Sequence, residues 1–139
     1  MKAQIFITRI YQFSAAHRLY NPVLNDKENR EIYDKCNNIN GHGHDYTLEI
    51  TLTGSPEPES GRIIPLSEFD SKINSVLKEI DYKHLNIEVD YFKENISSGE
   101  TIIQYLWHNI NKLFPAEMLY HLRLWETSNN FFDFGYMFT

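Results

Sequence analysis

The order in which two hydrophobic patterns follow each other limits the fold of this chain more than any other sequence feature. Apolar and polar residues alternate from His44 to Gly54, which is typical of a half-buried strand. Apolar residues instead recur at helical spacing from Leu66 to Ile80 and again from Ser97 to Pro115. Further strands are predicted at Gln4–Phe13, Leu119–Thr127 and Phe131–Phe138. Strand pairs on both sides of a helix pair predict an α+β fold, in which an antiparallel sheet carries both helices on one face.

A long polar segment separates the first two predicted strands. Residues 21–40 are rich in Asn, Asp, Glu and Lys, and a short helical turn is predicted near Glu28–Tyr33. Long irregular connections are uncommon inside compact domains and often carry function. If the two strands pair as a hairpin across this segment, their ends at residues 13–17 and 42–46 come together.

Composition excludes several classes of protein. The length of 139 residues is typical of a single domain spanning 1–139, and the formal net charge of −6 argues against binding to nucleic acid or to anionic membranes. The one cysteine, Cys36, rules out an internal disulfide, and a lone thiol fits a reducing compartment. The N-terminal segment does not resemble a signal peptide, and no apolar run approaches the roughly 18 residues of a membrane span. We therefore expect a soluble cytoplasmic protein.

The sequence His42-Gly43-His44 is a candidate metal site. On an extended segment, side chains two residues apart point to the same side, so both imidazoles can reach one ion, and Gly43 allows the backbone to approach closely. His17, at the end of the first strand, supplies a third imidazole if the hairpin forms. Three neutral imidazoles around Zn²⁺ leave a fourth position open, which is typical of a catalytic site. The alternative is an accidental pair of ordinary histidines. No comparable pairing is found for His84, His108 and His121, which are interpreted as structural.

The cysteine and three acidic residues each have a functional and a structural interpretation. A metal and a cationic environment near Cys36 would lower the pKa of its thiol and make it a base or a nucleophile, whereas the alternative is an inert small thiol. Glu126 lies on an otherwise apolar strand face, where its carboxylate either accepts hydrogen bonds from paired N–H groups of a ligand or is solvated at the strand end. Glu100 is interpreted as a capping-box residue that follows Ser97, and Asp81 as a cap where the preceding helix ends.

Fragments spread along the chain carry a family resemblance. They are FSAAHRL, CNNINGHGHDY, IDYKHLN, SSGET and LWETSNN, and the resemblance extends from about Ile5 to Phe138. In their order and intervals the chain resembles the 6-pyruvoyl tetrahydropterin synthases. The resemblance implies the tunnelling fold, a four-stranded antiparallel sheet with two helices on one face. It also implies that three subunits close a twelve-stranded barrel, that two trimers stack into a homohexamer, and that the active site lies between subunits.

The resemblance further implies a reaction and the residues that carry it. The family converts 7,8-dihydroneopterin triphosphate to 6-pyruvoyl tetrahydropterin and releases triphosphate, with Zn²⁺ as Lewis acid and a cysteine thiolate that moves protons. By the same resemblance, the zinc ligands are His17, His42 and His44, the catalytic residues are Cys36, Asp81 and Tyr82, and the substrate-binding residues are Glu126, Glu100 and Ser98. Glu126 matches the glutamate that holds the aminopyrimidine N–H groups of the pterin.

The interval between Cys36 and His42 favours the pyruvoyl-forming branch of the family. Five residues, NNING, lie between them, as is usual in that branch, whereas the carboxy-forming branch that serves queuosine synthesis usually has fewer. The folate-pathway variants place a glutamate near the cysteine position, and CNNINGHGH contains none. The alternative function is the carboxy-forming reaction on the same substrate.

One position departs from the family pattern. Family members have Asp-His where this chain has Asp81-Tyr82, and a phenol, whose ordinary pKa is about 10, is a poor base at neutral pH. A phenol can still relay a proton or hydrogen-bond a thiol, and His84 is an alternative substitute. The departure also supports a third hypothesis, a zinc-bearing pterin-binding protein with little activity. The basic candidates for holding the triphosphate are Arg18, Lys27, Arg30, Lys35 and Lys83.

Overall fold

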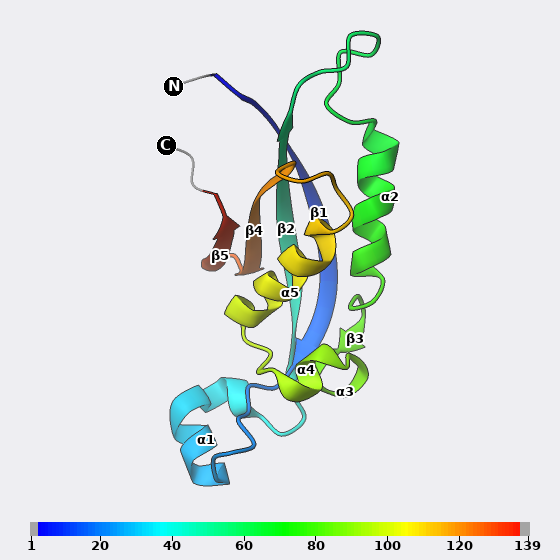
Figure 1. The fold of residues 1–139 in the computed structure, drawn as a ribbon. Helices are drawn as coiled ribbons and strands as arrows, with labels where there is room; N and C mark the ends of the chain where they lie inside the picture. Colours follow the sequence, from blue (N-terminus) through cyan, green and yellow to red (C-terminus); the bar gives the residue numbers. More distant parts are fainter. Residues whose placement is uncertain (1–2, 137–139) are drawn as a thin grey trace.

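The computed structural model describes residues 3–136, which form one sheet with two long helices and several short ones (Figure 1). The strands are β1 (Ile5–His17), β2 (His42–Gly54), β3 (Lys83–His84), β4 (Leu119–Thr127) and β5 (Asn130–Gly135). The helices are α1 (Asp26–Tyr33), the 3₁₀ helix η1 (Asp34–Asn37), α2 (Leu66–Leu77), α3 (Leu85–Glu88), α4 (Tyr91–Glu94) and α5 (Gly99–Asn111). This arrangement confirms the predicted α+β class.

Strands β1 and β2 form the long hairpin on which the sheet is built. They pair antiparallel from Ile5 opposite Gly54 to His17 opposite His42, so the predicted hairpin is confirmed. β1 continues past its predicted end at Phe13, because pairing with β2 overrides the weak strand propensity of the small residues that follow. The order of strands across the sheet is β3-β1-β2-β4-β5.

The sheet has five strands, whereas the family resemblance implied four. The additional strand, β3, has two residues and pairs in parallel with Ala15 and Ala16 of β1. The other neighbouring strands pair antiparallel. A strand as short as β3 is too brief to show an alternating pattern, so its sequence could not indicate it.

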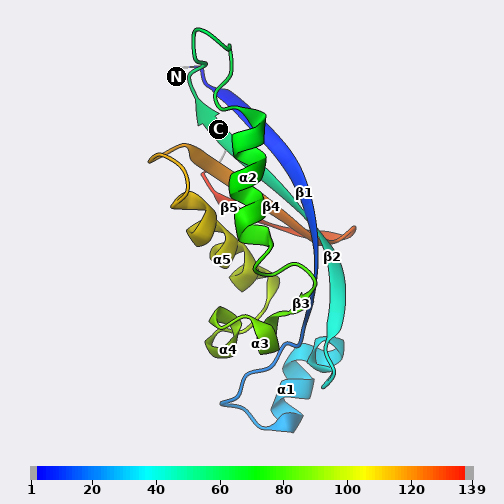
Figure 2. The same ribbon diagram turned by 90° about the vertical axis from the view of Figure 1, so that its right-hand side faces the viewer.

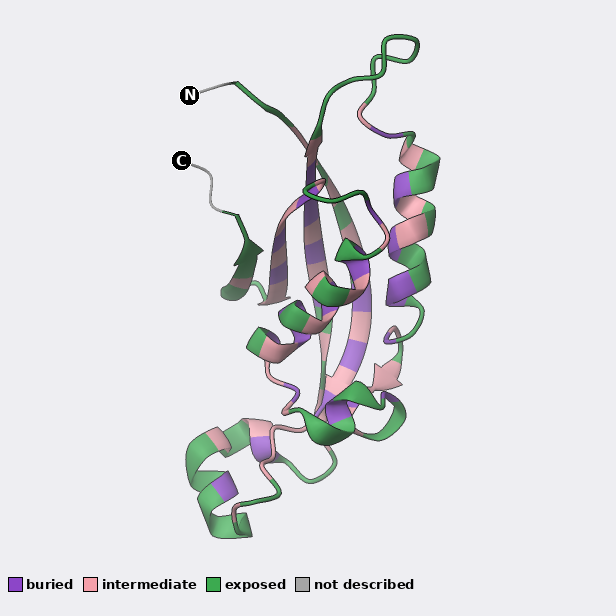
Figure 3. Ribbon diagram, in the orientation of Figure 1, coloured by how far each residue is buried: buried purple, intermediate pink, exposed green. Residues whose placement is uncertain are grey.

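Helices α2 and α5 lie on one face of the sheet, as expected (Figure 2). The buried residues of α2 are Phe69, Ile73, Val76 and Leu77, and those of α5 include Ile102, Ile103, Leu106 and Ile110. They meet alternate residues of the central strands, among them Leu48, Ile50 and Leu52, which have no exposed surface. Figure 3 shows this alternation of buried and less buried residues along the strands. The core is therefore the layer between the helix pair and the sheet.

A polar cluster holds α2 against β1. The guanidinium of Arg9 donates to both carboxylate oxygens of Asp70, at 2.9 and 3.0 Å, and the hydroxyl of Tyr11 donates to the same carboxylate at 2.6 Å. The hydrogen bond from Tyr11, followed by that from Arg9, holds the pKa of the Asp70 carboxyl below its usual range. Each polar group in this cluster therefore has a partner.

The face of the sheet opposite the helices carries polar and charged side chains. The indole N–H of Trp125 donates to Glu49 at 2.6 Å, and other residues of β4 and β5 form ion pairs across this face. Ile10, which lies opposite Glu49, is 65% exposed. β5 ends at Gly135, before the predicted end at Phe138, and that position lies outside the described residues. Among residues 3–136, no helix has the length and apolar character needed to cross a membrane.

The polar connection between β1 and β2 is a folded loop. Asn25 and Glu28 form a reciprocal capping box that starts α1. The side chain of Asn29 is fully buried and donates to three backbone carbonyls of the loop. The backbone N–H of Leu19 donates to the carbonyl of Cys36 at 2.8 Å, which fixes η1 beside the end of β1. The loop therefore places Cys36 next to the end of the hairpin.

Candidate metal centre and its surroundings

The end of the β1–β2 hairpin brings three histidines together. His17 is opposite His42 in the last pair of the hairpin, and His44 follows two residues later on the same face of β2. The ring centroids are 4.8 Å apart for His17 and His42, 5.2 Å for His17 and His44, and 4.8 Å for His42 and His44. One ring nitrogen of each histidine lies within 4.8 Å of the other two. This spacing allows the three side chains to reach a single metal ion.

The burial and hydrogen bonds of these rings fit a ligand role. His17 is 1% exposed, and its Nδ1–H donates to the carbonyl of Ser97 at 2.6 Å, which leaves Nε2 free to bind a metal. His17 Nε2 and His42 Nδ1 are buried and have no hydrogen-bond partner in the described part of the chain. Burial lowers the pKa of His17 to about 4 and also lowers the pKa of His42, so both rings are neutral at pH 7. Neutral imidazoles of this kind suit Zn²⁺.

Ser97 orients His17, and no sequence signal pointed to it. Its own side chain is fully buried and donates to Asn86 Oδ1 at 3.1 Å and to the carbonyl of Arg18 at 3.3 Å. Asn86 Oδ1 also accepts the backbone N–H of Arg18 at 2.8 Å. These bonds join the segment before α5 to the end of β1. The contact to His17 uses a backbone carbonyl, which every residue type possesses, and such a role cannot be recognised from residue identity.

The capping box predicted at the start of α5 is wrong in its residues. Ser98, not Ser97, is the N-cap, and its hydroxyl accepts the N–H of Thr101 at 3.4 Å. Glu100 is exposed in the first turn of the helix. Gly99 packs so closely against the ring of Phe132 that a Cβ would not fit without movement. Ser98 and Glu100 therefore lie directly after the segment that holds His17.

Cys36 and Glu126 lie near the histidines. Both side chains are half-buried, and Glu126 interacts electrostatically with Cys36 and with His42. Burial raises the pKa of the Cys36 thiol, and the carboxylates of Glu126 and Asp34 raise it further. The protein charges that act on the thiol are thus negative, and the lowering expected beside a metal ion stays a prediction. Glu126 at the end of β4 thus faces the candidate centre.

Tyr46 belongs to the same cluster, although the sequence motifs did not single it out. It follows His44 by two residues on β2, and none of its surface is exposed. Its ring stacks on Phe13 with centroids 4.8 Å apart, and its centroid lies 5.6 Å from that of His44. Burial, followed by the charges of Glu126 and Cys36, raises the pKa of its phenol. The alternation that predicted the two histidines on one face also places Tyr46 beside them.

Asp81 and Tyr82 lie at the edge of the sheet, where β3 meets β1. The carboxylate of Asp81 accepts the backbone N–H of Ser14 at 2.9 Å, so it caps this strand and not the preceding helix. The N–H of Tyr82 donates to the carbonyl of Ser14 at 2.6 Å, and Tyr82 has a φ of 59°. The Tyr82 side chain is 85% exposed. Within residues 3–136, no hydrogen bond joins either residue to Cys36.

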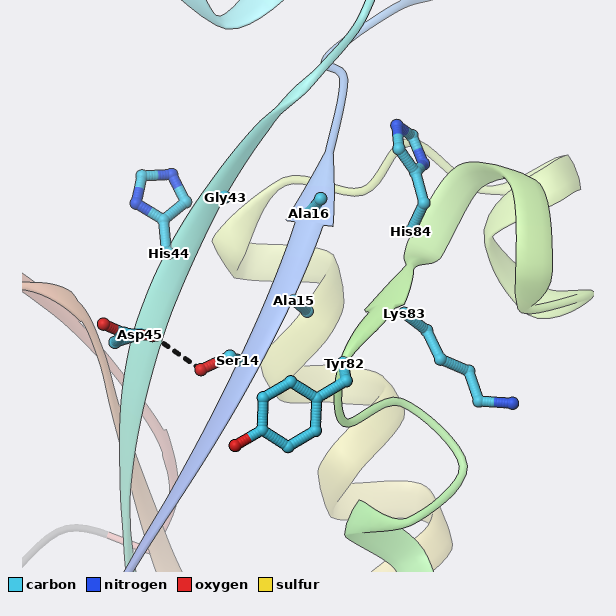
Figure 4. Close-up of a pocket in the computed structure, with 9 residues that line it drawn as sticks. All are labelled: Ser14, Ala15, Ala16, Gly43, His44, Asp45, Tyr82, Lys83 and His84. Atoms are coloured by element: carbon cyan, nitrogen blue, oxygen red, sulfur yellow. Dashed lines mark hydrogen bonds between the residues drawn. The ribbon is translucent and has the colours of Figure 1, made fainter.

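A cavity of about 330 Å³ lies between the hairpin end and this edge. His44 lies on one side of it and Tyr82 with Lys83 on the other, across the end of β1 (Figure 4). At its floor the hydroxyl of Ser14 donates to Asp45 at 2.6 Å. Residues of the candidate centre and of the exposed edge therefore line the same cavity.

The remaining histidines stay outside the cluster of three. His84 lies next to it, and its Nε2 occupies the space that a Cβ on Gly41 would need. His108 is exposed on α5, and His121 pairs with Asp133 at 3.2 Å on the opposite face of the sheet. The metal-compatible group identified in the described residues contains none of these three.

Two of the basic candidates for the triphosphate, Arg18 and Arg30, line a second cavity of about 330 Å³. The Nε–H of Arg18 donates to the carbonyl of Asn37 at 3.0 Å, and its guanidinium lies 4.5 Å from the ring centroid of Tyr20. Asp26 and Asp34 share the lining of the cavity. Among the ion pairs of residues 3–136, none involves Arg18 or Arg30.

Known proteins are similar to this chain over nearly its whole length. The family model for 6-pyruvoyl tetrahydropterin synthase matches residues 6–135. The 6-pyruvoyl tetrahydrobiopterin synthase of Homo sapiens is 36% identical over 130 residues, which are 93% of this chain and 90% of that protein. The protein of the same name from Drosophila melanogaster is 40% identical over 131 residues, 93% of this chain and 78% of that protein. The structure of Caenorhabditis elegans 6-pyruvoyl tetrahydropterin synthase matches with a TM-score of 0.91 at 34% identity and covers 96% of both chains.

Proposed function

The chain belongs to the 6-pyruvoyl tetrahydropterin synthase family, and from this premise we propose that it is a zinc-dependent lyase that converts 7,8-dihydroneopterin triphosphate to 6-pyruvoyl tetrahydropterin and triphosphate. The observation that carries the proposal is the grouping of three metal-compatible histidines with a cysteine and a glutamate. The matched relatives named above are synthases of this kind.

His17, His42 and His44 are proposed to hold the zinc ion. The ion, when bound, supplies a Lewis acid that acidifies the hydroxyls and adjacent C–H groups of the substrate side chain. The carbonyl of Ser97 fixes the proton of His17 on Nδ1, so Nε2 is the ligand atom. Low pKa values keep His17 and His42 uncharged at neutral pH, so these rings need lose no proton before they bind a cation.

Cys36 and Glu126 are proposed to act on the substrate itself. Glu126 accepts hydrogen bonds from the aminopyrimidine N–H pair, and the start of α5, with Ser98 and Glu100, contacts the other side of the pterin. Cys36 as a thiolate removes a proton from the side-chain carbon next to the carbon that bears the triphosphate and later returns a proton as a thiol. The electron pair released forms a C=C bond and expels triphosphate, and the resulting enol tautomerises to a ketone. Loss of the proton from the carbon attached to the ring, with its electron pair taken up by the C=N bond of the dihydropterin, turns the remaining alcohol into the second ketone and the ring into a tetrahydropterin, so no redox cofactor is needed.

Asp81 and Tyr82 are proposed to act from a neighbouring copy of the chain. The exposure of Tyr82 at a sheet edge and the absence of a hydrogen bond from Asp81 or Tyr82 to Cys36 within residues 3–136 support this assignment. In the proposed tunnelling-fold assembly, four strands from each of three copies close a barrel, two such trimers form a homohexamer, and pairing covers the sheet edges. The whole chain, 1–139, then acts as a single pterin synthase domain, and we propose that it does so in the cytoplasm.

The alternatives are two other functions, a carboxy-forming synthase and a pterin-binding protein. The carboxy-forming reaction would use the same zinc site and the same substrate, but the five residues between Cys36 and His42 favour the pyruvoyl product. A pterin-binding protein with little turnover is supported by Tyr82, whose phenol replaces the usual imidazole base. Neither alternative changes the proposed zinc ligands.

Arg18 and Arg30 are the preferred candidates for holding the triphosphate. They share one cavity, Arg18 directly follows a proposed zinc ligand, and neither guanidinium is paired with a carboxylate in the described residues. Guanidinium groups bind phosphate oxygens with two parallel hydrogen bonds. Replacing either by Gln should raise the KM for the triphosphate substrate and leave the affinity for 7,8-dihydroneopterin unchanged.

A product assay tests the proposed function. Zinc-loaded protein would be incubated with 7,8-dihydroneopterin triphosphate, and triphosphate release and pterin masses would be followed together. Triphosphate with 6-pyruvoyl tetrahydropterin is the expected result, and both should form about 100-fold more slowly in Cys36→Ser. Triphosphate with the 6-carboxy product and acetaldehyde would move the chain to the other branch. Tight pterin binding without turnover would instead identify a binding protein.

A further inference from the structure

Unpaired polar atoms gather at one place in the protein interior. Within residues 3–136, the buried side-chain atoms without a hydrogen-bond partner are His17 Nε2, His42 Nδ1, His84 Nδ1 and Tyr46 Oη. By contrast, the buried polar side chains of Asn29, Asn37, Thr51 and Ser97 are all hydrogen-bonded. Bound zinc would account for ligand nitrogens of the histidine cluster, but a neutral phenol is not among the usual zinc ligands. The hydroxyl of Tyr46 therefore needs a separate explanation.

The packing of Tyr46 prevents its hydroxyl from finding a partner by turning away. Phe13 stacks on one face of the ring with an interplanar angle of 8°, and the ring of His44 approaches it at 69°. No part of the residue is exposed to solvent. Because stacked buried rings do not rotate freely, the O–H is held at one position in the cluster.

Tyr46 lies beside the candidate site, with its ring centroid 5.6 Å from that of His44. Tyr46 interacts electrostatically with Glu126 and Cys36, and these two residues are half-buried while Tyr46 is fully buried. The phenol thus lies within electrostatic range of the two side chains that are proposed to act on the pterin. Because none of its surface is exposed, a bound molecule reaches the hydroxyl when one of these side chains moves aside.

Tyr11 shows how a tyrosine with a structural hydroxyl behaves in the same protein. It lies on β1, the strand paired with β2, and its hydroxyl donates to Asp70 at 2.6 Å within the cluster that includes Arg9. Tyr46, which is more deeply buried, has no such acceptor. A buried hydroxyl without a partner weakens the folded state, so its presence is easier to explain if the partner arrives with a ligand.

We propose that Tyr46 is a substrate-binding residue whose hydroxyl donates a hydrogen bond to an oxygen or nitrogen acceptor of a bound dihydropterin. This inference rests on the proposed function and adds a contact to it. An ordinary phenol is protonated at neutral pH and so serves as a donor. A buried donor that only the correct ligand satisfies also selects against molecules that lack an acceptor at that place.

Two matched variants, Tyr46→Phe and Tyr11→Phe, test the proposal because each removes one hydroxyl and keeps the ring. The zinc-loaded protein would be titrated with 7,8-dihydroneopterin in a calorimeter, and Tm would be measured without ligand. Tyr46→Phe should raise the Kd about ten-fold, the size expected for one lost hydrogen bond, and leave Tm equal or higher. Tyr11→Phe should lower Tm by a few degrees and leave the Kd unchanged, since its hydroxyl bonds only within the protein.

The outcomes separate this inference from the proposed function. If the unaltered protein binds 7,8-dihydroneopterin and Tyr46→Phe binds it within two-fold as tightly, the inference is overturned and the proposed function stands. If Tyr46→Phe lowers Tm as Tyr11→Phe does, the hydroxyl has a structural partner and the inference is likewise overturned. If the unaltered protein does not bind the pterin, both fail. Measured zinc content guards against loss of the metal centre as a cause of weaker binding.

Discussion

The histidine cluster and the Asp81–Tyr82 edge lie on two sides of one cavity, yet they are built in opposite ways. The histidines come from a continuous hairpin, and His17 among them is almost wholly buried. Tyr82 directly precedes the two-residue strand β3 at the edge of the sheet and is 85% exposed. The three histidines of the candidate metal centre therefore come together within one chain, whereas Tyr82 remains largely exposed among residues 3–136.

This difference indicates which side chains of the proposed site are positioned by the fold of one chain and which would be positioned only when several copies assemble. A metal ion requires ligand atoms at fixed short distances, and strand register supplies them within one molecule. An acid or base that acts from a second copy must instead remain at the surface until the copies meet. Four experiments test this difference between the histidine cluster and the Asp81–Tyr82 edge.

Removal of one histidine should have the largest effect. His44→Ala should reduce bound zinc from one ion per chain to a small fraction and slow product formation by about 1000-fold or more, because two imidazoles hold the ion poorly. Metal analysis and the product assay measure both quantities. His108→Ala, at an exposed position on α5, is the control and should change neither. Full zinc retention in His44→Ala would show that the hairpin end is not the metal site.

Mixing two inactive variants should restore activity if the edge serves a neighbouring copy. Cys36→Ser and Asp81→Asn should each retain zinc and lose about 100-fold in rate. In oligomers that contain both chains at random, about a quarter of the sites would combine an intact Cys36 with an intact Asp81 from another chain.

The rate of such mixed oligomers should therefore rise to about a quarter of that of the unaltered protein. Mixed oligomers of Cys36→Ser and Cys36→Ala, which lack an intact cysteine everywhere, serve as the control. A mixture of Cys36→Ser and Asp81→Asn that stays inactive would place Asp81 beside Cys36 of its own chain and remove the contrast between the two regions.

The burial of His17 in the histidine cluster should also affect how the free energy of unfolding depends on pH. The pKa of His17 is about 4 in the folded metal-free protein against an ordinary 6.5, so between these values the unfolded chain binds more protons. The free energy of unfolding should then fall by about 3 kcal/mol as the pH drops from 6.5 to 4 and should be fully restored above 6.5.

Denaturant unfolding of the metal-free protein across this pH range measures the effect. His17→Gln, whose amide can still donate to the carbonyl of Ser97, should flatten the dependence because it does not titrate. Tyr82→Phe at the exposed edge should leave the dependence as it is. Equal slopes for the unaltered protein and His17→Gln would mean that burial of this ring is not what makes the folded state sensitive to acid.

The smallest effect is expected at the edge itself. Tyr82→His should raise the rate about ten-fold if a phenol at this position is a weaker base than an imidazole. Zinc content and pterin affinity should not change, since the side chain is largely exposed and outside the metal-compatible cluster. A slower Tyr82→His enzyme would instead show that the phenol is the group adapted to this step, and Tyr82→Phe would then test its hydroxyl directly.

Regular patterns predicted much of the fold and the centre of the site. The alternation in β2 and the helical spacing in α2 and α5 correspond to the observed elements, because one face of each is buried. The hairpin register then followed from placing residues 13–17 opposite 42–46. That register alone brings His17 to His42.

Features that depend on contacts distant in sequence could not be predicted. Ser97 acts through its carbonyl, and β3 exists only because two residues meet the edge of β1. The pKa of Cys36 is raised because the folded loop buries it beside Glu126 and Asp34. The alternating pattern could have indicated Tyr46, since its side chain lies on the same face of β2 as those of His42 and His44. Its burial and its unpaired hydroxyl, however, appear only in the three-dimensional structure.

Because the register of the β1–β2 hairpin is continuous, insertions and deletions have different consequences within the strands and within the connection between them. An inserted or deleted residue within β1 would turn His17 to the opposite face of the sheet and disperse the ligands. The connection from Arg18 to Gly41 lies outside the pairing, so it can grow or shrink while His17 and His42 remain opposite each other. Descendants can thus exchange the loop that carries Cys36, and with it the chemistry proposed for this residue, while they keep the three histidines together.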